Sequence, residues 1–88
     1  MDDETARLLR ELGDTIERSQ ADGQIDDDER VELRRLVERV QAALAEPAGE
    51  HEGIVDHIES TAVRFEVDHP GLAGMLRSVV DTLSGYGI

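Results

Sequence analysis

The stretch SQADGQIDDDER holds the residue types and spacing that come nearest to a metal site. A calcium-binding EF-hand loop takes oxygen ligands at its first, third and fifth positions, a glycine at the sixth and a bidentate glutamate at the twelfth. When Glu29 is aligned with the last position, Gly23 falls on the sixth, Asp22 on the fifth and Asp26 on the ninth. Asp22, Asp26 and Glu29 are therefore the candidate ligands of a divalent cation.

The first half of such a loop lacks its ligands in this chain. The first position falls on Arg18 and the third on Gln20, and a guanidinium carries donors and a positive charge but no acceptor. The same residues also describe a turn followed by a helix start, in which Gly23 supplies the turn geometry and Asp26 pairs with Glu29 as a capping box. We expect the turn and cap, and a calcium-like binding protein is the alternative function.

No arrangement of histidine, serine or glycine predicts catalysis. Glu66 and His69 have the E-x-x-H spacing of di-iron bundles, but such a site needs a second motif of this kind and two further glutamates. The other histidines, His51 and His57, do not share a helix face. The serines lack the glycine frame of a nucleophile elbow. We therefore expect no enzyme, no catalytic residue, no bound metal and no cofactor.

The charge of the chain restricts its partners. Its 88 residues include 21 acidic and 9 basic side chains, for a net charge of −12, and every basic residue is arginine. Binding to nucleic acid or to an anionic membrane needs a basic surface, so we expect neither partner. An acid excess without lysine is typical of cells that accumulate salt, because molar salt screens self-repulsion. A GC-rich genome is the alternative, and it explains the arginine but not the acid excess.

The chain carries no sign of export or of membrane insertion. Its start, MDDETARLL, is acidic and lacks the basic and apolar regions of a secretory signal. No apolar run approaches the roughly 18 residues that a membrane span requires. We expect a cytoplasmic protein.

Apolar residues recur at helical spacing in four segments. The first covers about 3–19, the second starts after Asp26 and ends at Pro47, the third covers roughly 50–67, and the fourth carries apolar residues over 72–83. Proline ends the second helix because it cannot continue helical hydrogen bonding. No segment alternates as a strand would.

These four segments predict one all-α domain over residues 1–88. Two helical hairpins joined by a short linker pack most simply as a compact antiparallel four-helix bundle. The alternative is a homodimer, in which the two hairpins pair with a second chain. Because the chain is rich in apolar stripes and poor in catalytic groups, we expect a non-catalytic protein-interaction module whose protein partner the sequence does not identify.

The C-terminal half resembles a known family. His51-Glu52, the RFE triplet at residues 64–66, DHPGLAGML at 68–76 and the ending VVDTLSGYGI resemble the prokaryotic domain-of-unknown-function family 4404. The resemblance implies a helical fold and transfers no catalytic residue. It also marks positions that are more specific than packing demands, and these candidate interaction residues are Arg64, Phe65, His69, Pro70, Tyr86 and Ile88. The alternative is that Phe65 is a core residue and Pro70 a helix start.

Overall fold

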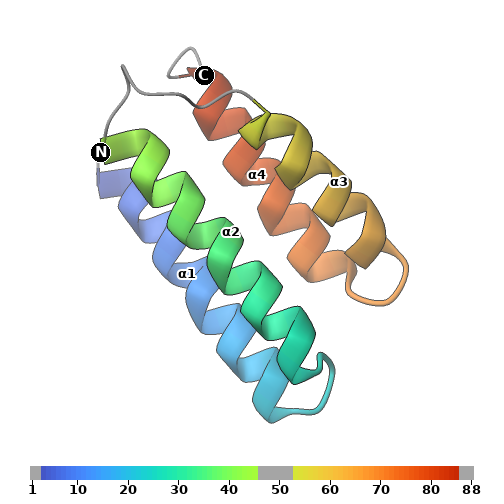
Figure 1. Cartoon of the computed structure of the whole chain (residues 1–88). Coiled ribbons are helices and arrows are strands. Elements are labelled where there is room, and N and C mark those ends of the chain that lie inside the picture. Colours follow the sequence, from blue (N-terminus) through green and yellow to red (C-terminus); the bar gives the residue numbers. More distant parts are fainter. Residues whose placement is uncertain (1–2, 46–52, 86–88) are drawn as a thin grey trace.

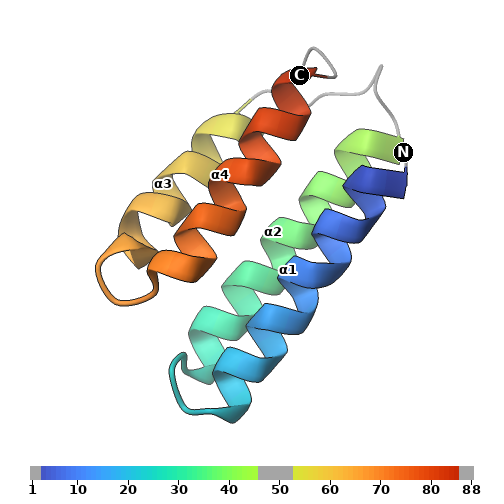
Figure 2. The same cartoon turned by 180° about the vertical axis from the view of Figure 1, so that it is seen from behind.

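The computed structural model describes residues 3–45 and 53–85. They form four helices, α1 (Asp3–Ala21), α2 (Asp27–Ala45), α3 (Ile54–Glu66) and α4 (Pro70–Gly85), with no strand in either range. Figure 1 shows α1 and α2 as one antiparallel hairpin and α3 and α4 as a second. Each helix contacts two others, in the order α1, α2, α3, α4 around the bundle. In Figure 2, which views the bundle from the opposite side, α1 and α4 lie in front. The predicted bundle of two helical hairpins is confirmed.

The predicted helix ends need small corrections. α1 continues two residues past Ser19, to Ala21. The third helix, predicted from Glu50, begins at Ile54, because Gly53 before it adopts a left-handed backbone with φ of 83°. Residues 46–52, with the predicted break at Pro47, lie outside the described residues. No described helix is both long enough and apolar enough to cross a membrane.

The inner faces of the helices follow the period predicted from the sequence. Each helix turns a stripe of aliphatic residues toward the centre, and Ile25, in the turn between α1 and α2, joins them. Ile16, Leu33 and Ile58 have no exposed surface. Among the described residues, every buried side-chain nitrogen or oxygen has a hydrogen-bond partner. The core is therefore closed within one chain, by these residues: Leu9, Leu12, Ile16, Ile25, Leu33, Leu36, Val37, Val40, Ala43, Leu44, Ile54, Ile58, Ala62, Phe65, Leu72, Ala73, Leu76, Val79 and Leu83.

The helix pairs differ in how closely they pack. The contact between α3 and α4 is the most extensive, and each of these helices buries a small side chain completely, Ala62 on α3 and Ala73 on α4. The contact between α2 and α3 is the least extensive. The two hairpins therefore pack together mainly through α1 and α4. At the seam between α2 and α3, long side chains make the contacts between the two helices.

Candidate functional site

The turn between α1 and α2 ends the first helix through backbone hydrogen bonds. Gly23 has a φ of 76°, a left-handed conformation that glycine adopts at no steric cost. The N–H groups of Gln24 and Ile25 both reach the carbonyl oxygen of Ser19, at 2.8 and 3.3 Å. These bonds satisfy the end of α1 in the manner of a glycine-terminated helix.

The start of α2 is a reciprocal capping box. The N–H of Glu29 donates to Asp26 Oδ1 at 2.7 Å, and the N–H of Asp26 donates to Glu29 Oε1 at 3.0 Å. Two main-chain donors that no helix can satisfy internally are thereby paired. Ile25, just before the cap, is 4% exposed and packs in the core. The predicted turn and cap is confirmed.

The same geometry bears on the alternative calcium-like site. The carboxylates of Asp26 and Glu29 are each engaged by the other residue's N–H, while Asp22 is exposed. Within residues 3–45 and 53–85, no three histidine or carboxylate side chains come close enough to hold a metal ion together. The cation site gains no support from this arrangement and stays a prediction.

The candidate interaction residues of the C-terminal half have different surroundings. Phe65 is 4% exposed and its ring lies 5.7 Å from that of half-buried His69, so both side chains are accounted for by packing. Pro70 is exposed and is the first residue of α4, where the lack of an N–H costs nothing. Tyr86 and Ile88 lie outside the described residues.

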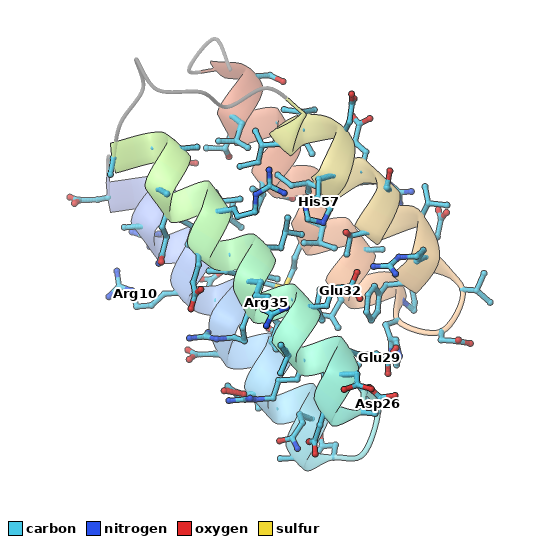
Figure 3. The ribbon with its side chains drawn as sticks, in the orientation of Figure 1. Arg10, Asp26, Glu29, Glu32, Arg35 and His57 are labelled. Atoms are coloured by element: carbon cyan, nitrogen blue, oxygen red, sulfur yellow. The ribbon has the colours of Figure 1, made fainter. Side chains whose placement is uncertain are left out.

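Arg64, the remaining candidate, lies at the seam between α2 and α3. Its guanidinium forms an ion pair with Glu32 of α2, and 56% of its side chain stays exposed. About two helix turns from the Glu32 pair along the same seam, Arg39 Nη1 lies 2.5 Å from His57 Nδ1. Figure 3 shows Glu32 on α2 and His57 on α3 between the two helices. Because arginine only donates, this contact requires His57 Nδ1 to be the acceptor.

A second polar contact joins the helices of the first hairpin. Arg30 Nε and Nη2 donate to the two carboxylate oxygens of Glu17, at 2.6 and 2.8 Å. This hydrogen bonding lowers the pKa of Glu17, and the same contact raises the pKa of Arg30. Both side chains are well exposed, so the pair orients the hairpin more than it stabilises it.

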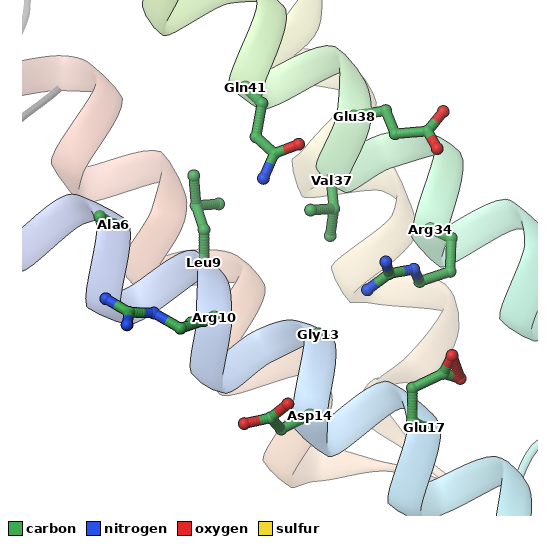
Figure 4. A pocket seen from close by; sticks show the side chains of 10 residues that line it. All are labelled: Ala6, Leu9, Arg10, Gly13, Asp14, Glu17, Arg34, Val37, Glu38 and Gln41. Atoms are coloured by element: carbon green, nitrogen blue, oxygen red, sulfur yellow. The ribbon is translucent and has the colours of Figure 1, made fainter.

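A groove of about 520 Å³ lies between α1 and α2. Its apolar floor includes Leu9 and Val37, and Gly13 leaves room beside them for Arg34 (Figure 4). Charged and amide side chains form its rim, among them Arg34 and Gln41.

Two exposed valines stand out on the outer side of α3. Val63 is 61% exposed and Val67, one turn later, is 87% exposed. Among the described residues, the one other large apolar side chain with comparable exposure is Val31 of α2, at 40%. α3 and Val67, the residue that follows its last turn, therefore present two β-branched side chains to solvent.

Sequence reasoning missed the groove and the valines. In the sequence, Gly13 is only a residue that lowers the stability of α1, because no local pattern links it to Arg34 on the neighbouring helix. Val63 and Val67 fall one turn apart, on the face opposite the buried Ile58. This helical spacing was the sequence feature that could have predicted an exposed apolar face.

Comparison with known proteins places the chain in a family but not in a pathway. No curated protein and no solved structure matches it significantly. The model of one family, described as "Domain of unknown function (DUF4404)", matches residues 5–88. This match covers nearly the whole chain and agrees with the resemblance seen in the C-terminal half, so the chain belongs to the DUF4404 family.

Proposed function

We propose that this protein is a non-catalytic interaction module that works as a homodimer paired through the outer face of α3. The observation that supports this function is the exposure of Val63 and Val67 in a chain that otherwise places most of its large aliphatic side chains in one core. Adjacent exposed apolar side chains on one helix face are a common mark of a protein contact. A second copy that packs against this face removes Val63 from water.

The sequence of α3 is self-complementary when two copies run antiparallel. In one register, Ser60 of each copy lies opposite Val63 of the other, so a small side chain faces a large one. The same register places Glu59 opposite Arg64, and two-fold symmetry repeats this pair of opposite charges. Arg64 can serve Glu32 and a partner together, because a guanidinium has five N–H donors. The match of side-chain size and of charge in this register thus favours a second copy of the chain, and not an unrelated helix, as the partner.

The net charge of −12 makes this pairing dependent on salt. Two such chains repel each other at low ionic strength, and molar salt shortens the screening length to about 3 Å. We propose that the host cell accumulates salt and that the protein works in its cytoplasm, where the acid excess keeps it hydrated. A face one helix wide is at the lower end of specific interfaces, so we expect a weak dimer whose population depends on protein concentration.

Sedimentation equilibrium in molar potassium chloride tests the dimer. We expect the wild-type chain to associate, and we expect Val63→Asp to weaken association at least tenfold because it buries an unpaired carboxylate from each copy near the centre of the interface. Val31→Asp is the matched control, since Val31 is also an exposed valine but lies on α2. A wild-type chain that stays monomeric at every concentration would contradict the proposal, as would equal dimerisation by Val63→Asp.

A further inference from the structure

Gly13 is a buried glycine in the middle of α1, on the side that faces α2. Glycine there destabilises the helix by about 1 kcal/mol relative to alanine, so its presence requires a reason. A Cβ at this position would lie 2.8 Å from Arg34 Nη1, which is closer than real Cβ contacts allow. The absence of a side chain therefore admits the guanidinium of Arg34 against the surface of α1.

The guanidinium of Arg34 acts on the nearby Glu17 carboxylate through its charge and not through a direct contact. Within residues 3–45 and 53–85, no ion pair or side-chain hydrogen bond involves Arg34. Glu17 is near enough for Arg34 to help lower its pKa, but the hydrogen bonds to the Glu17 carboxylate come from Arg30. In a chain with 21 acidic residues, a half-buried arginine between two helices has been left with free donors.

The surroundings of Arg34 combine an apolar floor with a second donor. Leu9 and Val37, 4% and 5% exposed, line the groove beside it. Figure 4 shows the side chains of Arg34 and Gln41 reaching from α2 toward α1 on either side of Val37. The groove volume of about 520 Å³ lies within the range of small-molecule sites.

The charges around the groove select the kind of anion. Arg10 and Arg34 contribute two positive charges, and Asp14 and Glu38 contribute two negative charges at the rim. Glu17 is already neutralised by Arg30. The groove therefore carries no net positive charge, so an anion is attracted by the guanidinium of Arg34 and not by the groove as a whole, and Asp14 and Glu38 repel a single negative charge less than a phosphate dianion.

From these contacts we propose that the groove between α1 and α2 binds an aliphatic carboxylate. The planar guanidinium of Arg34 binds the carboxylate through two parallel N–H donors, which is the geometry that arginine and carboxylate prefer. The hydrocarbon lies over Leu9 and Val37, and the amide of Gln41 donates a further hydrogen bond. This site is on the first hairpin, away from the α3 face of the proposed dimer, and does not depend on it.

The carboxylate has two possible sources, a free short-chain acid or the C-terminus of a peptide that ends in an aliphatic residue. NMR titration of the Leu9 and Val37 methyl groups in molar potassium chloride tests both, with hexanoate as one probe and a short peptide ending in leucine as the other. Hexanamide and the amidated peptide are the controls, because they keep the hydrocarbon and lose the charge. Saturable shifts with either acid support the site and assign its source. The absence of shifts with both acids would overturn it.

Substitutions separate binding from folding. We expect Arg34→Gln to weaken binding at least tenfold, because charge-assisted hydrogen bonds are lost. Arg35→Gln, at the exposed neighbouring arginine outside the groove, is the matched control and should bind as the wild type does. We expect Gly13→Ala to melt at a higher temperature and yet to bind more weakly, since its methyl group displaces the guanidinium. Unchanged affinity in Arg34→Gln would overturn the proposal.

Discussion

Removing the Asp26 side chain tests whether the turn after α1 acts as a helix cap. Asp26→Ala deletes the oxygen that accepts the N–H of Glu29 at 2.7 Å and leaves that donor to water. Loss of an N-cap acceptor costs about 1 kcal/mol, within a range of roughly 0.5–2 kcal/mol. In a domain of this size, such a loss lowers the melting temperature by roughly 4–8 °C. Urea and thermal unfolding, followed by far-ultraviolet circular dichroism, measure both quantities.

Two control variants, Asp26→Asn and Asp22→Ala, distinguish the loss of the cap from the loss of a surface charge. Asp26→Asn keeps an oxygen acceptor, so we expect it to stay within a few tenths of a kcal/mol of the wild type. Asp22→Ala removes an exposed carboxylate that accepts no hydrogen bond in the described structure, and we expect no change in stability. Calcium should leave all of these melting temperatures unaltered. The cap would be refuted by an unaltered Asp26→Ala, and a calcium-dependent rise that needs both Asp22 and Asp26 would restore the cation site.

Three further predictions follow from other contacts. The pKa of Glu17 is lowered from its ordinary value of 4.5, so the stability contributed by its pairing with Arg30 is present above that value and is lost as the pH falls through the lowered pKa. Arg30→Gln should bring the Glu17 pKa back up in a carboxyl-detected NMR titration, and an unchanged midpoint would contradict this. His57, which accepts from Arg39, should carry its proton on Nε2, and long-range proton–nitrogen spectra that place it on Nδ1 would show the contact to be wrong. Gly13→Ala should raise the free energy of unfolding by up to about 1 kcal/mol, because the atom it displaces is the flexible end of Arg34, and a loss measured in urea would contradict that reasoning.

The parts of the fold that could be predicted from the sequence depend on local chemistry. The capping box of Asp26 and Glu29 lies within four residues, so its two hydrogen bonds can be predicted from the residue types and their spacing alone. The inner faces of the helices follow from the helical spacing of aliphatic residues, and Phe65, a candidate interaction residue with core packing as the alternative, lies in the core. The predicted start of the third helix was wrong, because Gly53 adopts a left-handed conformation that the composition of that segment does not specify.

The candidate sites required contacts between helices, which no local pattern encodes. Arg34 meets Gly13 only because α1 and α2 cross at one particular register. The ion pair of Arg64 with Glu32 likewise depends on how the second hairpin docks against the first. Arg64 was selected from the sequence for its family motif, whereas its role in closing the seam between α2 and α3 became visible only in the folded chain.

The most direct test of the proposed homodimer is an isotope-filtered NOE experiment on a sample that mixes labelled and unlabelled chains in molar potassium chloride. Such spectra detect only contacts between different copies. The antiparallel register of α3 predicts NOEs from the Val63 methyl groups of one copy to Ser60 of the other. Spectra without any contact from Val63 of one copy to the other, at concentrations where the chain sediments as a dimer, would contradict an interaction through this face.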